Sequence, residues 1–115
     1  MSSRMTRVFL MAAALVSSAY PAAADRSRLV SCKLVVDGQE FINGTCRFSP
    51  LGRDGSFQIM SGNGQYFAQV NVEARGQGYG YWNGEPFASH AHSNLGLLVQ
   101  QQACWVNGRA SVCAW

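Results

Sequence analysis

Short stretches of alternating hydrophobic and polar residues run along most of the chain after residue 25. In the clearest of them, every second residue from Tyr66 to Ala74 is apolar or aromatic. A period of two predicts β-strands, and no stretch shows the 3.6-residue period of an amphipathic helix. We therefore expect strands at residues 29–36, 39–42, 46–48, 56–60, 66–74, 78–82, 95–101, 103–106 and 110–115.

Asp-Gly and Asn-Gly pairs punctuate these stretches. Such pairs tolerate the positive φ angles that the two central residues of a tight hairpin turn adopt. The six pairs are Asp37-Gly38, Asn43-Gly44, Asp54-Gly55, Asn63-Gly64, Asn83-Gly84 and Asn107-Gly108. We expect the first two strands to pair across Asp37-Gly38. Eight or nine short strands between turns predict an all-β fold, a small antiparallel barrel or sandwich of about eight strands.

The first 24 residues have the pattern of a cleavable signal peptide. Two arginines precede an apolar run at residues 8–16, and Ala22 and Ala24 provide the small side chains of a cleavage site. Nine apolar residues are too few to span a membrane as a helix. The sequence predicts a signal peptide over 1–24, a single β domain over 25–115, and a periplasmic or secreted protein. Residues 29–32 also resemble a bacterial lipoprotein box, but three charged residues separate them from the apolar run.

All four cysteines, Cys32, Cys46, Cys104 and Cys113, belong to the expected mature domain. An even number in an exported chain predicts two disulfides, and the spacing matches no familiar zinc site. A four-residue loop at 107–110 would place Cys104 opposite Cys113, close enough for a bridge. The sequence favours Cys32–Cys46 with Cys104–Cys113, and a pairing between the first and last strands stays open.

Charged residues are few and scattered over residues 25–115, with seven basic and six acidic side chains. Nucleic-acid binding requires a basic patch, which this distribution does not provide. His90 and His92 are two residues apart and would share one face of a strand, where both could reach a metal ion. Only Glu85 is near in sequence as a third ligand, and the sequence predicts no cofactor and no catalytic residue.

A glycine-rich aromatic run at residues 76–84 is the strongest indication of binding. Tyr79 and Tyr81 would share one face of a strand, and Trp82 would face the other. Tyrosine and tryptophan are enriched in contact surfaces because they combine large area with few torsions. The same rings would also serve as stacking platforms for sugars, or would fill the interior of a small barrel.

Two segments resemble the periplasmic and membrane-bound inhibitors of C-type lysozyme. They are Ser61-Gly62-Asn63-Gly64-Gln65-Tyr66 and Tyr79-x-Tyr81-Trp82-Asn83-Gly84-Glu85. The resemblance implies a small exported barrel in which a serine, here Ser61, and a lysine engage the lysozyme cleft. Asn83 stands at the position of that lysine, and one extra residue precedes Tyr66. The chain also resembles other small exported proteobacterial proteins.

These observations predict a non-catalytic extracytoplasmic binding module, with inhibition of a cell-wall hydrolase as its role. An extracytoplasmic protein or cell-wall glycan is the expected partner, and the alternatives are a glycan- or peptidoglycan-binding module and a metal-binding protein or enzyme centred on His90 and His92. The predicted binding residues are Ser61, Tyr66, Tyr79, Tyr81, Trp82 and Asn83.

Overall fold

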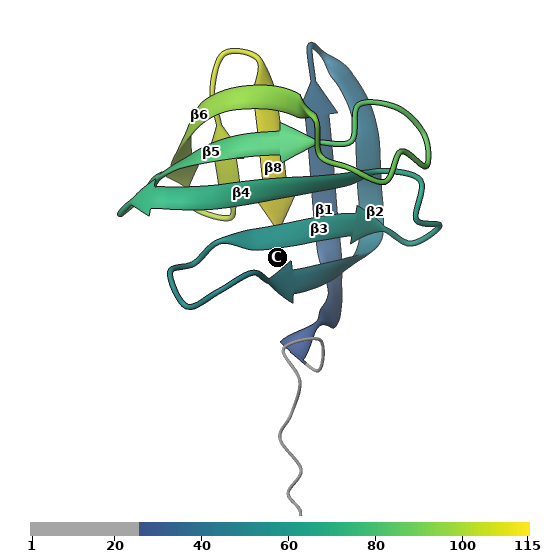
Figure 1. Ribbon diagram of the computed structural model, residues 1–115, viewed down its shortest axis with the longest axis horizontal. Helices are drawn as coiled ribbons and strands as arrows, with labels where there is room; N and C mark the ends of the chain where they lie inside the picture. The colour runs from purple at the N-terminus through teal and green to yellow at the C-terminus, as the bar shows by residue number, and fades with distance from the viewer. Residues whose placement is uncertain (1–25) are drawn as a thin grey trace, which may run out of the picture.

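The computed structural model describes residues 26–115, which form one closed antiparallel barrel (Figure 1). The predicted signal peptide lies outside the described residues. The all-β prediction is confirmed, and of the two architectures expected, the chain adopts the barrel. Its eight strands are β1 (Arg28–Val36), β2 (Gln39–Pro50), β3 (Phe57–Ser61), β4 (Phe67–Ala74), β5 (Gln77–Trp82), β6 (Ser93–Gln101), β7 (Cys104–Val106) and β8 (Ala110–Ala114).

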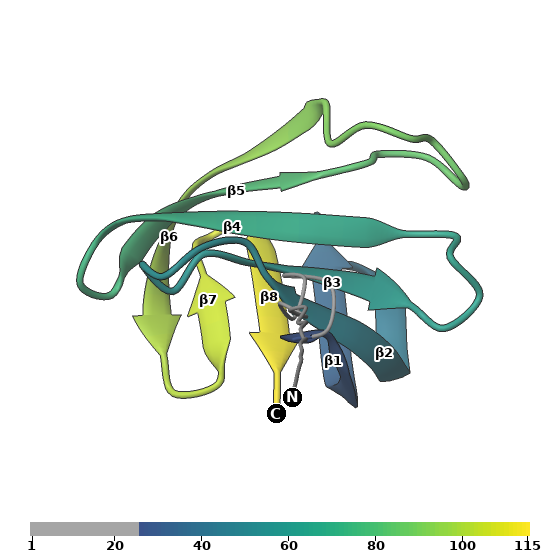
Figure 2. The same ribbon diagram turned by 60° about the horizontal axis from the view of Figure 1, so that its bottom comes forward.

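The barrel closes where β8 returns to β1. Cys32 lies opposite Ala114, and the pairing continues to Val36 opposite Ala110. Figure 2 shows β8 beside β1 on the side of the barrel away from β5. Within residues 26–115, every strand thus has two hydrogen-bonded neighbours along at least part of its length, so the sheet has no edge strand of the kind that readily pairs with another chain.

The first hairpin forms across Asp37-Gly38, as predicted. Val36 lies opposite Gln39, and the two turn residues have φ angles of 52° and 80°. Two successive positive φ angles give the type I′ turn, whose twist matches that of the strands it joins.

The prediction of a turn at Asn43-Gly44 is wrong, because both residues lie inside β2. This strand pairs first with β1 and then, from Cys46 onward, also with β3, so it must bend around the barrel (Figure 1). Gly44 has a φ of 139°, which other residues rarely adopt, and glycine is a common means of bending a barrel strand. Asn43-Gly44 therefore forms a bend within one long strand, whereas two short strands at 39–42 and 46–48 were expected.

Inward-facing aliphatic and aromatic side chains fill the barrel. Gly80 of β5 also faces inward, and a Cβ there would lie 2.6 Å from Leu98 Cδ1 and 3.1 Å from Leu95 Cβ. Glycine is thus required at this position because two leucine side chains of β6 pack directly against the β5 backbone. The largest fully buried residues are Leu34, Ile59, Leu95, Leu98, Val70 and Val112, together with Cys32 and Cys46.

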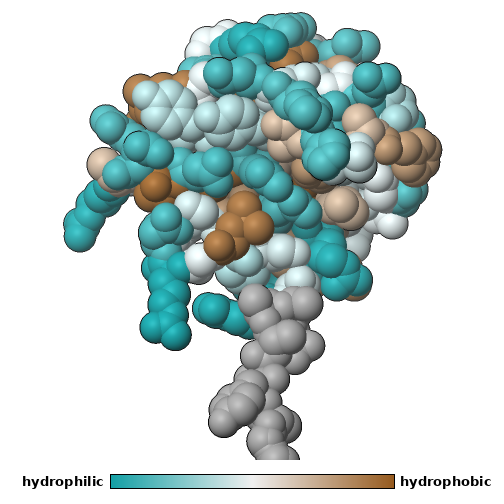
Figure 3. Space-filling view, viewed as in Figure 1, coloured by the Kyte–Doolittle hydropathy of each residue, from teal (hydrophilic) through white to brown (hydrophobic). Residues whose placement is uncertain are grey.

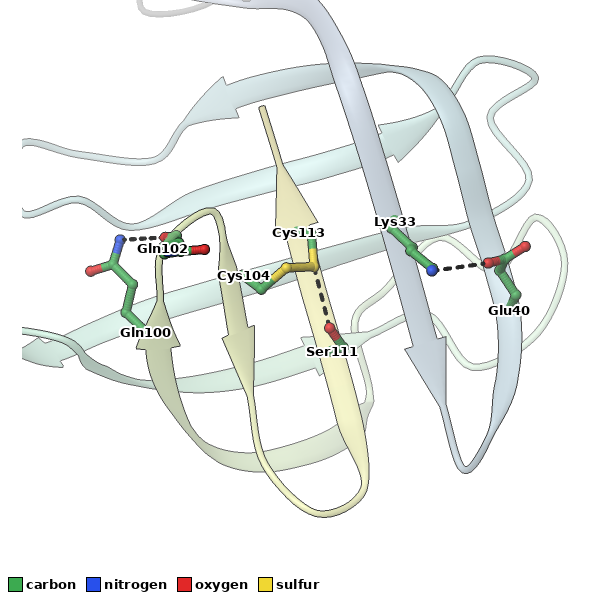
Figure 4. Close-up of a disulfide and its surroundings, with 7 residues drawn as sticks. All are labelled: Lys33, Glu40, Gln100, Gln102, Cys104, Ser111 and Cys113. Atoms are coloured by element: carbon green, nitrogen blue, oxygen red, sulfur yellow. Dashed lines mark hydrogen bonds and ion pairs between the residues drawn. A yellow bond between two sulfur atoms is a disulfide. The ribbon is translucent and has the colours of Figure 1, made fainter.

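Two disulfides link neighbouring strands at the positions expected, Cys32–Cys46 and Cys104–Cys113. The last cross-strand pair of β7 and β8 is Val106 with Ser111, which is the register of a four-residue connection over 107–110, so Cys104 lies opposite Cys113 (Figure 4). Cys32 and Cys46 bridge β1 and β2 diagonally and are fully buried in the barrel. Disulfides in so small a domain are compatible with an oxidising, extracytoplasmic environment. Within residues 26–115, no helix is long and apolar enough to cross a membrane.

Candidate functional site

The six residues predicted to bind a partner divide into three groups. Trp82 and Asn83 are buried, with exposed fractions of 6% and 4%. Ser61, Tyr66 and Tyr81 are half-buried, and Tyr79 is exposed. Because they are buried, Trp82 and Asn83 offer little area for contact with a partner.

Trp82 belongs to an aromatic cluster with Tyr66 and Phe41. The ring centres of Phe41 and Trp82 lie 4.5 Å apart, and those of Phe41 and Tyr66 lie 5.1 Å apart. Aromatic rings at such distances add to the stability gained from burial. The cluster packs against the core where β3 and β5 end, and therefore supports the two loops that follow these strands.

The first of these loops, residues 62–66, is organised by hydrogen bonds of its own. Ser61 Oγ accepts a hydrogen bond from the Tyr66 N–H at 3.0 Å and donates one to Asn63 Oδ1 at 2.8 Å. Asn63 Oδ1 in turn accepts from the Gln65 N–H. The Ser61 hydroxyl thus forms two hydrogen bonds within the turn and stabilises its conformation.

Asn83 ties this turn to the second loop, residues 83–92. Its Oδ1 accepts a hydrogen bond from the Phe67 N–H at 3.2 Å. Its Nδ2 lies 3.1 Å from the Gln65 carbonyl oxygen and 3.1 Å and 3.2 Å from those of Glu85 and Ala88. A single buried amide therefore joins the two segments that carry the resemblance to the lysozyme inhibitors, and fixes the path of the longer loop.

Phe87 protrudes from the loop that Asn83 holds. Its side chain is 68% exposed, and its φ angle is 62°. A left-handed conformation is unusual for a bulky residue, costs about 1–3 kcal/mol, and persists only where the surrounding structure imposes it. The hydrogen bond from the Phe87 N–H to the Gln65 carbonyl oxygen, at 2.8 Å, fixes this conformation. Figure 3 shows hydrophobic surface at the edge of the molecule where the loop lies in Figure 1.

A cleft of about 650 Å³ lies between this loop and the outer side of β3 and β4. Gln58 and Gln69 form part of its floor and are hydrogen-bonded to each other, Gln69 Nε2 to Gln58 Oε1, at 2.8 Å. The cleft thus combines aromatic, amide, imidazole and thioether groups. Its lining residues are Gln58, Met60, Gly64, Phe67, Gln69, Phe87, Ala88, Ser89, His90, Ala91 and His92.

The two histidines lie together on the loop side of the cleft. Their ring centres are 5.2 Å apart, with the planes inclined at 75°. Within residues 26–115, no group of three or more His, Cys, Asp or Glu side chains is arranged to hold a metal ion. Glu85, the third ligand considered from the sequence, does not line this cleft.

Tyr79 and Tyr81 lie on the outer face of β5, as the alternation predicts. Tyr81 is the strand partner of Gln69 in the cleft floor, and Tyr79 is the partner of Leu97 on β6. Leu97 and Val99 are 44% and 46% exposed. Exposed apolar and aromatic surface therefore continues from the cleft across β5 onto β6.

Sequence reasoning missed Phe87, Met60 and the pair Leu97 and Val99. Phe87 is an aromatic residue in an otherwise polar segment that contains a proline, and that contrast could have marked it. Met60 is the one methionine in residues 26–115, but only the fold places it in the lining of the same cleft as the histidines. No protein-family model, curated protein or solved structure matches this chain.

Proposed function

We propose that the protein is a non-catalytic extracytoplasmic binding module and that its partner is a cell-wall hydrolase, which it inhibits. The observation that carries the proposal is the exposed Phe87, held in a left-handed conformation by a buried hydrogen-bond network. Unfavourable backbone conformations of this kind concentrate at functional sites.

A rigid, protruding aromatic residue suits a protein partner. The anchor residues of protein interfaces are commonly large side chains that enter a pocket. Because Asn83 and Gln65 already fix the loop, binding would lose little conformational entropy. The enclosed substrate cleft of a hydrolase is the kind of concave surface that such a loop complements.

The resemblance to the lysozyme inhibitors supports a contact surface at this same end of the barrel. The serine turn and the segment after Trp82 are far apart in sequence but joined through Asn83 and Gln65. Asn83 is buried where the family has its contact lysine, so we assign the contact to Phe87, four residues later. Tyr81 and Tyr79 would extend the contact over the outer face of β5.

Phe87→Ala tests the proposal against a matched control. Leu51→Ala removes another exposed apolar side chain, 46% exposed, from the β2–β3 loop at the opposite end of β3. Both variants should melt like the parent protein, because neither side chain is buried. Phe87→Ala should weaken binding and inhibition of a C-type lysozyme by about thirtyfold, whereas Leu51→Ala should not change them.

The assay is clearing of a peptidoglycan suspension by the lysozyme, paired with a direct binding measurement. Full inhibition by Phe87→Ala, or no inhibition by the parent protein, would refute the proposal. Sedimentation of the parent protein with insoluble peptidoglycan, without inhibition of the enzyme, would instead support a glycan-binding module.

A further inference from the structure

Every histidine and every methionine of residues 26–115 lines the same cleft. The full chain contains two histidines, His90 and His92, and its other methionines all lie in residues 1–11. Side chains of these two types are the neutral nitrogen and sulfur ligands that transition metals bind in proteins. Their coincidence in one cleft is a property of the fold, because Met60 comes from β3 and the histidines from the loop before β6.

The spacing of the two imidazoles suits a shared ion. Two imidazoles on one tetrahedral ion, with metal–nitrogen distances of about 2.0–2.1 Å, place their ring centres about 5 Å apart. The observed separation is 5.2 Å. Both side chains are exposed, so a metal ion could be bound without moving any part of the core.

The cleft offers Met60 as a third ligand. Met60 lies on β3, opposite Phe67 of β4, and both residues line the cleft. The two glutamines of the cleft are hydrogen-bonded to each other, so the Gln58 Oε1 atom already accepts a hydrogen bond and is a weaker competitor of Met60 as a metal ligand. A thioether is thus the soft donor that faces the same space as the imidazoles.

We propose that His90, His92 and Met60 form a copper(I) site. Thioether ligands select copper(I), whereas zinc and nickel are bound well by imidazole and gain little from a thioether. The ligand set therefore favours copper(I) over the divalent ions that the two histidines alone would bind. Phe87, on which the proposed inhibition rests, lines the same cleft but is not one of the three proposed ligands.

The test is a copper(I) competition titration of the oxidised mature protein against a chromophoric chelator, without oxygen. The parent protein should bind one copper(I) per chain. His90→Ala and His92→Ala should each weaken binding by at least about tenfold, equivalent to about 1.4 kcal/mol. Met60→Leu, which keeps the size of the side chain, should weaken copper(I) binding by a similar factor and leave zinc(II) binding unchanged.

Ser89→Ala is the matched control, because Ser89 lines the cleft on the same loop but has no expected role as a ligand. It should bind copper(I) like the parent protein. X-ray absorption of the copper complex should show a sulfur ligand that Met60→Leu removes, so the sulfur assignment does not depend on affinity alone. Absence of copper(I) binding, or unchanged binding by His92→Ala or Met60→Leu, would overturn the proposal. Thermal melts of the metal-free variants exclude unfolding as the cause.

Discussion

Replacement of Asn83 by alanine tests how the loop at the end of the barrel is held. The substitution removes the acceptor of the Phe67 N–H and the donor that serves the carbonyl oxygens of Gln65, Glu85 and Ala88. If this amide fixes residues 83–92, its loss should both destabilise the domain and release Phe87 from its left-handed conformation.

The magnitude follows from the groups that the truncation leaves without partners. Phe67 is only 7% exposed, and a buried N–H without an acceptor costs about 1–3 kcal/mol. The three carbonyl oxygens share the two N–H hydrogens of one amide, so about two further hydrogen bonds of about 1 kcal/mol each are lost. The total is about 3–5 kcal/mol. For a domain of this size, in which 1 kcal/mol corresponds to about 4–8 °C, the melting temperature should fall by about 12–40 °C.

Circular dichroism melts and urea unfolding would measure the loss of stability, and amide hydrogen exchange would report on the loop. The Phe87 and Phe67 N–H groups should exchange faster in Asn83→Ala, while those of β1 and β8 change only with global stability. Asn71→Ala, which truncates an exposed asparagine of β4, is the control and should melt like the parent protein. An unchanged melting temperature for Asn83→Ala, with Phe87 still protected, would refute this account of the loop.

Four further results are expected. Trp82→Ala should cost about 3–5 kcal/mol of stability because the ring is buried, whereas Tyr79→Ala should leave the melt almost unchanged. Gly80→Ala should cost about 1–3 kcal/mol in the same urea unfolding experiment, because its Cβ would collide with a core leucine. Reduction of the disulfides should destabilise the domain by about 2–5 kcal/mol per bridge, measured by melts with and without reductant. The backbone N–H of Ser56, followed by its hydroxyl, lowers the pKa of Asp54, so the stability from this carboxylate is present above the ordinary pKa and lost as pH falls through the lowered one. Asp54→Asn should remove that part of the acid dependence in urea unfolding at several pH values.

The sequence alone determined the features that depend on neighbouring residues. Alternation located the strands and placed Tyr79 and Tyr81 on one face of their strand and Trp82 on the other face, because successive side chains of a strand point to opposite sides. Asp37-Gly38 specified a type I′ turn through its positive φ angles. The even number of cysteines and their spacing favoured the bridges Cys32–Cys46 and Cys104–Cys113, and both are present.

Tertiary structure decided the features that depend on residues distant in sequence. The choice between barrel and sandwich was made by the pairing of β8 with β1, which no local pattern specifies. The pattern that makes a turn at Asp37-Gly38 makes a bend at Asn43-Gly44, because β2 continues there to reach β3. Burial of Asn83, the conformation of Phe87 and the cleft that Met60 shares with the histidines all arise where the ends of β3 and β5 meet. Their physical cause is the pairing of β3 with β4 and of β4 with β5, which places the loops of two successive hairpins side by side at one end of the barrel.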